Sequence, residues 1–277
     1  MASKDIQERY EWGHRTIVEV AEIARSHFSQ KGLIVETKAD ESPVTIADRA
    51  VEEAFRKAVQ QDFPEDGILG EEYDSKDEEN GFRWVIDPID GTYSFIHGVP
   101  LWGTLLALEF EGSVVAGWAY MPELGELVSA AKGQGAQWLR GYDSQRQAFS
   151  VADQVTVSRD KTSLKDALFC HSSSDYFREA DQYLLLQALE TEVSGNRCWS
   201  DCYAMVLLAT GRVDLVVEPA LQYWDYAPFL IIVPEAGGVI KDFAGQSPEG
   251  KTNLVIASKE LYPEAAKFVT EHMTNEA

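Results

Sequence analysis

The sequence predicts an α+β fold in which helices and strands are packed in layers. Helical patterns of apolar residues alternate along the chain with apolar runs of strand length, and turn residues separate these runs. Mixed elements of this kind are typical of layered packing around a shared core. With 45% hydrophobic residues among 277, the chain can build one large domain or two closely joined halves.

Two helices are expected near the N-terminus. Apolar residues recur at helical spacing between Ile6 and Phe28, and a second such pattern runs from Ala47 to Val59. A polar stretch from Thr37 to Thr45 separates the two patterns. A short apolar run, Ile68-Leu69, then leads into Gly70-Glu71-Glu72, and an acidic turn is expected after it.

The rest of the chain predicts mostly strands, with helices towards the C-terminus. Two apolar runs between Gly103 and Tyr120 are separated by Glu111-Gly112, which predicts a β-hairpin. Further strands are expected at 84–86, 127–131, 136–139, 215–217 and 254–257. Helices are expected at 203–209, 224–236 and 262–272, and Gly237-Gly238 is expected to end the second of them.

The composition and charge argue against several classes of protein. The formal net charge is −22 and the acids are spread along the chain, so a basic groove for nucleic acid is not expected. No apolar run reaches the roughly 18 residues needed to cross a bilayer, and the polar N-terminus lacks signal-peptide features. We therefore expect a cytoplasmic protein without a membrane partner. A surface this negative repels phosphate esters unless a bound cation neutralises the site.

The three cysteines form no recognisable framework. Cys170, Cys198 and Cys202 give an odd count without a paired motif, so neither disulfides nor a zinc site is expected. The spacing of Cys198 and Cys202 places both on one face of an expected helix, where small buried residues are common.

The densest chemical signal lies between Trp84 and Thr92. An apolar run ends at Asp87, a second acid follows at Asp90, and the proline between them stiffens the turn. The residues after Asp90 are expected to begin a helix, whose unpaired N–H groups favour an anion. Two carboxylates beside an anion site require cations between them, and oxygen ligands of this type suit Mg²⁺. Two ions about 3.5–4 Å apart would stabilise both the attacking and the leaving oxygens.

Three other acids are candidates to join this pair. Glu71 follows an apolar run and a glycine, Asp48 stands close after Thr45, and Asp225 lies at the start of a helical pattern. Taken alone, each is better explained as a helix cap, a helix-start charge or a solvated surface acid.

Four segments together resemble the inositol monophosphatase superfamily. They are Lys38 to Asp48, Gly70 to Glu72, Trp84 to Leu108 and Trp224 to Gly238, and they follow the family's order. The resemblance implies a layered αβαβα sandwich, as in inositol monophosphatase and fructose-1,6-bisphosphatase, and a homodimer. It also implies that residues 1–150 form an α+β half with most metal ligands. Residues 151–277 would form an α/β half with the remaining ligand and the substrate pocket, within one structural unit.

The resemblance implies a phosphomonoesterase that uses two or three Mg²⁺ ions. The implied metal ligands are Glu71, Asp87, the Ile89 carbonyl, Asp90 and Asp225. Gly91 and Thr92 would cradle the phosphate. In this family a metal-held water is the nucleophile, and Glu71 would help to activate it together with the Thr92 hydroxyl, which Asp48 would hold. A cation makes a bound water acidic enough to ionise near neutral pH.

The segment after Asn196 resembles the histidinol-phosphate phosphatase branch of the family. The implied substrate is a small phosphorylated metabolite, histidinol phosphate, which carries an ammonium group and an imidazole. Asp201 and Glu218 would pair with these groups, and Arg197 would order the acids. Asp201 is explained equally well as the N-cap of a helix that begins near Tyr203.

Three alternatives stay open. An inositol-1-monophosphatase, or another polyol or nucleotide phosphatase of the same fold, would share the metal site and differ only in the pocket. A haloacid-dehalogenase-type phosphatase would use an Asp-x-Asp motif, but Asp87 and Asp90 are three positions apart. A metal-binding regulatory protein would have no chemical need for the complete set of acids.

Overall fold

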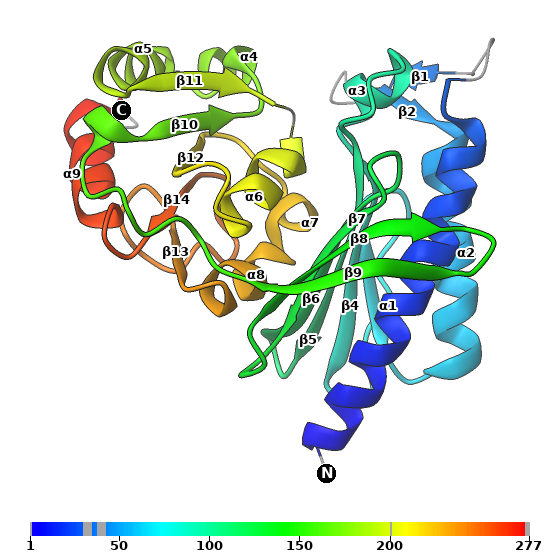
Figure 1. Cartoon of the computed structure of the whole chain (residues 1–277). Coiled ribbons are helices and arrows are strands. Elements are labelled where there is room, and N and C mark those ends of the chain that lie inside the picture. Colours follow the sequence, from blue (N-terminus) through cyan, green and yellow to red (C-terminus); the bar gives the residue numbers. More distant parts are fainter. Residues whose placement is uncertain (1, 30–34, 38–42, 200, 275–277) are drawn as a thin grey trace.

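The protein is built of five layers, α, β, α, β and α (Figure 1). The structure, a computed structural model, describes residues 2–29, 35–37, 43–199 and 201–274. The first layer comprises α1 (Ala2–His27) and α2 (Ile46–Asp62). The third layer comprises α6 (Asp201–Ala209), α7 (Tyr223–Tyr226) and α8 (Phe229–Glu235). The fifth layer comprises α4 (Ser174–Glu179), α5 (Tyr183–Glu192) and α9 (Tyr262–His272). A seven-stranded sheet and a five-stranded sheet lie between them. The predicted αβαβα sandwich is confirmed.

The seven-stranded sheet is a meander with one parallel pair at its edge. Its strands are β3 (Gly67–Gly70), β4 (Phe82–Asp90), β5 (Gly103–Phe110), β6 (Ser113–Met121), β7 (Glu126–Ala131), β8 (Ala136–Asp143) and β9 (Ala148–Val155), in that spatial order. Only β3 and β4 run parallel. The predicted hairpin is β5–β6, and its turn residues Glu111 and Gly112 have φ values of 49° and 76°. Two left-handed residues suit a tight hairpin turn.

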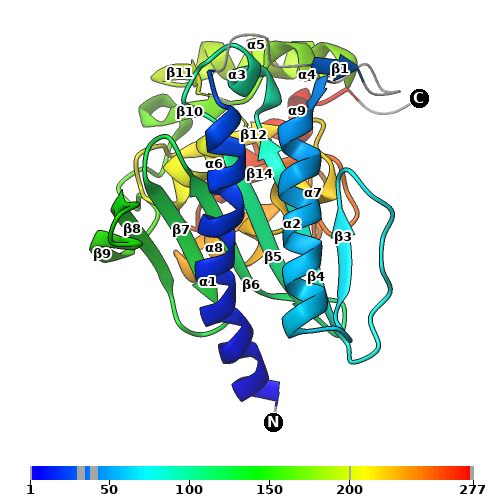
Figure 2. The ribbon, with the colours of Figure 1, turned by 90° about the vertical axis from the view of Figure 1, so that its right-hand side faces the viewer.

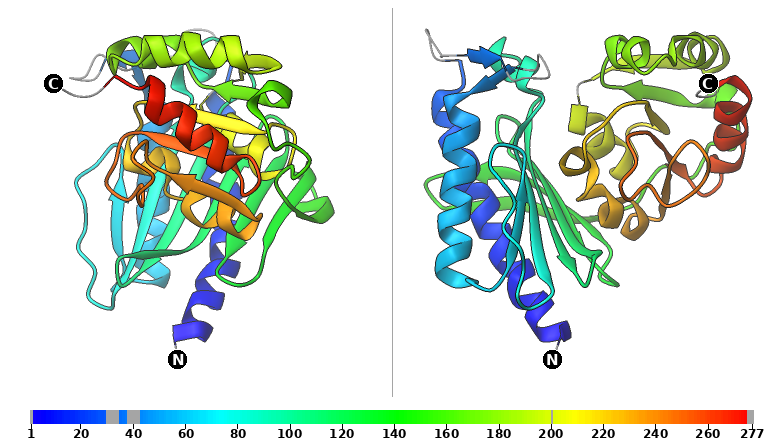
Figure 3. Two further views of the ribbon diagram at one scale, coloured as in Figure 1. Left: turned by 90° about the vertical axis from the view of Figure 1, so that its left-hand side faces the viewer. Right: turned by 180° about the vertical axis from the view of Figure 1, so that it is seen from behind.

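The five-stranded sheet has its parallel strands at one side. Its order is β11 (Gly195–Cys198), β10 (Leu168–His171), β12 (Leu215–Glu218), β14 (Leu254–Ser258) and β13 (Gly238–Lys241). The first three are parallel, and β14 is antiparallel to both of its neighbours. The carboxyl ends of β10, β11 and β12 therefore lie at the same edge, which is where Glu218 stands. On the outer face of this sheet, α9 packs against β14 (Figure 3).

Apolar cores fill the spaces between the layers. The helices α1 and α2 lie side by side on one face of the large sheet (Figure 2). Phe55 and Trp118 belong to the core between these helices and the sheet. Ile232 of α8 belongs to the core around the middle helices, and Leu189 of α5 and Val269 of α9 belong to the core between the outer helices and the five-stranded sheet. The strands β4, β5 and β6 of the large sheet are buried on both faces, which explains why they are continuous apolar runs.

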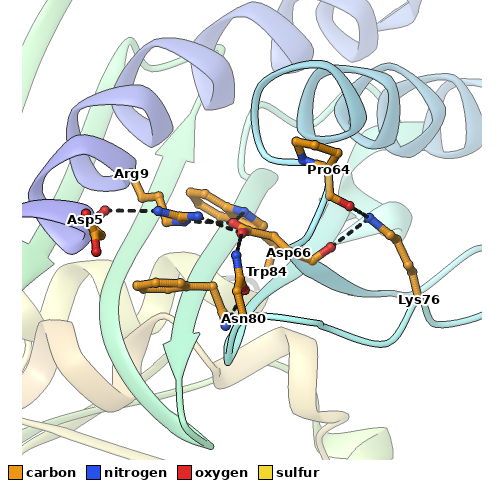
Figure 4. A network of polar contacts seen from close by, with 8 residues as sticks. Asp5, Arg9, Pro64, Asp66, Lys76, Asn80 and Trp84 are labelled. Carbon is orange, nitrogen blue, oxygen red and sulfur yellow. Dashed lines mark hydrogen bonds and ion pairs between the residues drawn. The ribbon is translucent and has the colours of Figure 1, made fainter. Parts of the chain in front are cut away.

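A buried ion pair fixes α1 to the edge of the large sheet (Figure 4). Arg9 donates to both carboxylate oxygens of Asp66, at 2.8 and 2.7 Å. Asp66 is fully buried and also accepts from the Trp84 indole at 2.9 Å and from Asn80 at 2.8 Å. Because every oxygen of this buried carboxylate is hydrogen-bonded, the pair holds the N-terminal helix without an uncompensated charge.

The structure corrects several expectations about elements. The helix expected at 224–236 is two helices, α7 and α8, because Pro228 lacks the N–H that a continuous helix needs there. The polar stretch 37–45 contains β2 (Pro43–Thr45), which pairs with β1 (Val35–Thr37), and residues 38–42 lie outside the described part. Cys198 ends β11 whereas Cys202 lies in α6, so the prediction that both lie on one face of a helix is wrong. All three cysteines are free.

The division between the sheets falls within the middle of the chain. Strand β9 ends at Val155, and every strand of the five-stranded sheet follows it. Among the described residues, no helix combines the length and apolarity that spanning a membrane requires.

Candidate active site

A bulge in β4 turns its two aspartates to the same side of the sheet. Asp87 lies opposite Leu105 and Asp90 lies opposite Gly103, so two residues of β4 face one residue of β5. Residues three apart in a regular strand point to opposite faces, and the extra residue removes this difference. The Thr104 hydroxyl donates to the Pro88 carbonyl at 2.8 Å and fixes the bulge. The Asp-Pro-Ile-Asp sequence thus directs both carboxylates towards the middle helices.

Asp225 joins the pair from the other half of the molecule. It lies in α7, where its carboxylate accepts from the Gln222 N–H at 2.7 Å in a capping box. One carboxylate oxygen from each of Asp87, Asp90 and Asp225 lies within 4.8 Å of the other two. Asp90 also accepts from the Cys202 N–H, in the first turn of α6, at 2.7 Å. Two middle helices therefore converge on the carboxyl end of β4.

The electrostatics of this cluster favour a bound cation. Burial, followed by the charges of Glu71, Asp90 and Asp225, raises the pKa of Asp87 well above its usual range. Burial also raises the pKa of Asp90, and its next largest causes are the carboxylates of Asp201 and Asp225. Buried carboxylates this close cannot all ionise without a compensating positive charge. Hard, convergent oxygens of this kind fit Mg²⁺, so the donor set suits the expected metal.

Glu71 is brought to the cluster by a loop that a buried glutamate holds. Glu71 shares a side-chain hydrogen bond with Asp87. Beneath this loop, Glu52 of α2 is fully buried and accepts from the Glu72 N–H at 2.8 Å and from Arg56 Nε at 2.8 Å. A Cβ on Gly70 would lie 2.1 Å from the Glu52 carboxylate, so only glycine fits at that point. Glu52 therefore sets the path of the backbone on both sides of Glu71.

The residues expected to cradle the phosphate, Gly91 and Thr92, lie at the start of α3 (Thr92–Ile96). Gly91 is its N-cap, with a φ of 84° that favours glycine. The Thr92 hydroxyl donates to the Ile89 carbonyl at 3.1 Å. Ile89, Gly91 and Thr92 therefore lie together directly beyond the β4 bulge.

The expected hydrogen bond between Thr92 and Asp48 is not present. Asp48 accepts instead from the N–H and hydroxyl of Thr45, at 2.8 and 2.6 Å, and so completes the capping box of α2. A hydroxyl has a single proton to donate, and that of Thr92 is directed to Ile89. Burial is the largest cause that raises the pKa of Asp48 to about 6, and the nearby charge of Glu71 contributes.

The acids expected to contact the substrate lie at the edge where the parallel strands end. Glu218 is buried and accepts from the Ser172 N–H at 2.7 Å and from its hydroxyl at 2.5 Å. Burial raises the pKa of Glu218 to about 8, and the charges of Asp201 and Asp225 add to this effect. Asp201 is the first described residue of α6. Arg197 is exposed on β11 and donates to the Asn196 carbonyl.

Sequence reasoning missed four residues that shape this site. Glu52 holds the loop that carries Glu71, and the Ser172 hydroxyl donates to Glu218. Glu109 accepts from Tyr223 of α7. The phenol of Tyr176 in α4 lies near Asp201 and Asp90, whose charges act with burial to raise its pKa. Only Glu52 had a signal in the sequence, because it is a glutamate on the apolar face shared by Val51, Phe55 and Val59.

Comparison with known proteins identifies the family. The sequence profile of the inositol monophosphatase family matches residues 5–274. This chain belongs to the inositol monophosphatase family. The fold agrees, since the structure of an inositol monophosphatase from Thermotoga maritima superposes with a TM-score of 0.81 at 28% identity, over 95% of this chain and 97% of that one.

Two curated relatives of this chain carry the names of different phosphatases. A histidinol-phosphatase of Chlorobaculum parvum is 39% identical over 220 residues, which cover 79% of this chain and 80% of the relative. An inositol-1-monophosphatase of Mesorhizobium japonicum is 30% identical over 246 residues, 88% of each chain. The chain is thus more similar to the first of these relatives than to the second.

Proposed function

We propose that this member of the family is a Mg²⁺-dependent phosphomonoesterase that hydrolyses histidinol phosphate to histidinol and phosphate. The observation that carries the proposal is the convergence of Asp87, Asp90 and Asp225 within 4.8 Å of one another. Such a cluster is costly unless it binds cations. The relative with the higher identity, a histidinol-phosphatase, supports the choice of substrate.

In this proposal the metal is held by Glu71, Asp87, the Ile89 carbonyl, Asp90 and Asp225, which would accommodate two or three Mg²⁺ ions. Mg²⁺ bound there supplies the positive charge that acidifies a water molecule and offsets negative charge on the phosphate and the leaving oxygen. Glu71 would accept the proton of the attacking water. The Gly91 and Thr92 N–H groups, at the start of α3, would orient the phosphate.

The roles of Thr92 and Asp48 follow from their hydrogen bonds. The Thr92 hydroxyl is held by the Ile89 carbonyl and so can orient water beside it. Asp48 would contribute through its charge, which lies close enough to Glu71 to influence the site without touching Thr92.

The substrate pocket is proposed at the Asp201–Glu218 side of the metal cluster. Besides burial, the charge of Asp201 raises the pKa of Asp90, and the charges of Asp201 and Asp225 raise the pKa of Glu218, so these carboxylates lie close to one another. The ammonium and imidazole of histidinol phosphate would supply the opposing positive charge. Arg197, exposed at the end of β11, would approach the substrate from outside. A homodimer, a cytoplasmic location and a role in histidine biosynthesis belong to the same proposal.

Substrate preference tests the proposal directly. With Mg²⁺ present, kcat/KM should be roughly tenfold or more higher for histidinol phosphate than for inositol 1-phosphate, because one charge-assisted hydrogen bond contributes about 1.5–3 kcal/mol. Phosphate release from both substrates measures this ratio. The reverse order would identify an inositol monophosphatase, and no release from either substrate would favour a metal-binding regulatory protein.

A further inference from the structure

The position of Asp225 depends on how α7 is held against the large sheet. Asp87 and Asp90 come from β4, whereas Asp225 comes from the other half of the chain. The three carboxylates converge only if α7 keeps a fixed position relative to β4. The contacts between this helix and the sheet therefore bear on the metal site.

A buried glutamate links α7 to β4. The Tyr223 hydroxyl in α7 donates to Glu109 Oε1 on β5 at 2.5 Å. The second oxygen, Oε2, accepts from Arg83 Nε on β4 at 2.5 Å. Arg83 and Glu109 are register partners across the β4–β5 pair. The chain of contacts thus runs from the helix that carries Asp225 to the strand that carries Asp87 and Asp90.

Burial makes this link strong. Glu109 is only 2% exposed, so each of its oxygens needs a hydrogen-bond partner. A hydrogen bond to a buried charge is among the stronger polar contacts in proteins.

The backbone next to Asp225 lies directly on the sheet. A Cβ on Gly117 of β6 would lie 2.5 Å from the Pro228 carbonyl oxygen, so glycine permits this close approach. Val85, Ala107 and Ala227 form a small apolar cluster at the same contact. Tyr223 anchors the chain before Asp225, and Pro228 rests on the sheet after it.

We propose that Tyr223 and Glu109 are a positioning pair that sets the distance of Asp225 from Asp87 and Asp90, and through it the affinity of the site for divalent ions. This inference rests on the metal site proposed above. Partners that orient metal ligands typically change metal affinity by roughly 10–100-fold when they are lost. Neither residue needs to touch the ion or the substrate for this effect.

Mn²⁺ titration, with free Mn²⁺ counted by electron paramagnetic resonance, measures the effect without any turnover. Tyr223→Phe and Glu109→Gln should each weaken Mn²⁺ binding roughly tenfold. The double variant should be little weaker than either single variant, because both remove the same contact. The Mg²⁺ concentration that half-saturates phosphate release from histidinol phosphate should rise by a similar factor.

Tyr226→Phe is the matched control. Its hydroxyl lies on the same helix but within hydrogen-bond distance of the Pro248 and Lys251 carbonyls rather than of Glu109. This variant should lose stability and keep the Mn²⁺ affinity of the wild type. Wild-type affinity in both Tyr223→Phe and Glu109→Gln, or an equal loss in Tyr226→Phe, would overturn the positioning role. A wild type that binds no Mn²⁺ and releases no phosphate would refute the proposed function instead.

Discussion

At the scale of single residues, buried acids in this protein have two different uses. Asp87, Asp90 and Asp225 face one another and could hold a cation. Glu52 faces protein donors, Glu72 N–H and Arg56, and holds the backbone around Glu71. The distinction lies in the neighbours: the Glu52 carboxylate lies against an arginine and a backbone N–H, whereas each carboxylate of the cluster lies against two other carboxylates.

The substitution Glu52→Gln tests whether Glu52 holds the backbone around Glu71. One amide oxygen cannot serve both donors that the carboxylate serves, so we expect a loss of about 1–3 kcal/mol in the free energy of unfolding. Because the Glu71 loop loosens, kcat should fall more than KM changes. Urea unfolding and steady-state phosphate release measure both. Glu53→Gln is the control, because Glu53 is 58% exposed and pairs only with Lys57. Equal effects of the two changes would contradict the role of Glu52.

His171 makes stability depend on pH. It is buried between Phe169 and Phe177, and burial lowers its pKa from 6.5 to about 4. Between these values the His171 side chain binds a proton in the unfolded chain but not in the folded one, so the contribution of His171 to stability falls as the pH falls from 6.5 to about 4. His171→Leu should reduce this fall by on the order of 2 kcal/mol, as measured by urea unfolding at several pH values. An unchanged pH dependence would contradict the assignment.

At the scale of elements, the sequence predicted which acids matter better than it predicted how they meet. The spacing of Asp87 and Asp90 indicated a metal site, but a plain strand would have turned them to opposite faces. The bulge that aligns them depends on the register of β4 with β5, which is a contact between distant segments. For the same reason the bonds of Thr92 and Asp48 were predicted wrongly, since each found a nearer partner.

The contact between β6 and the α7–α8 junction offers a test at this scale. Gly117→Ala would place a methyl group 2.5 Å from the Pro228 carbonyl oxygen, so the helices must move from the sheet. We expect a loss of about 1–3 kcal/mol of stability and weaker Mn²⁺ binding. Gly195→Ala is the control, because its Cβ would meet only Leu168 Cδ1 at an ordinary 3.6 Å. Tight Mn²⁺ binding in Gly117→Ala would show that the close approach is not required.

At the scale of the whole molecule, the layered architecture could be predicted because several segments resemble one family in the same order. The helices α4 and α5 and the strand β13 were not predicted from the apolar patterns of the sequence. The site lies where the two sheets and the middle helices meet, and each half supplies part of it. With a formal net charge of −22, the molecule as a whole disfavours the approach of phosphate esters, which a cation at the site would offset.

Phosphate release from histidinol phosphate, with Mg²⁺ and after its removal by a chelator, tests the central claim most directly when wild type and Asp87→Asn are compared. The account predicts that release requires Mg²⁺ and that Asp87→Asn lowers kcat/KM roughly a hundredfold or more, because a lost ligand costs at least as much as a lost supporting partner. Release that continues without divalent ions, or an Asp87→Asn variant with wild-type turnover, would contradict it.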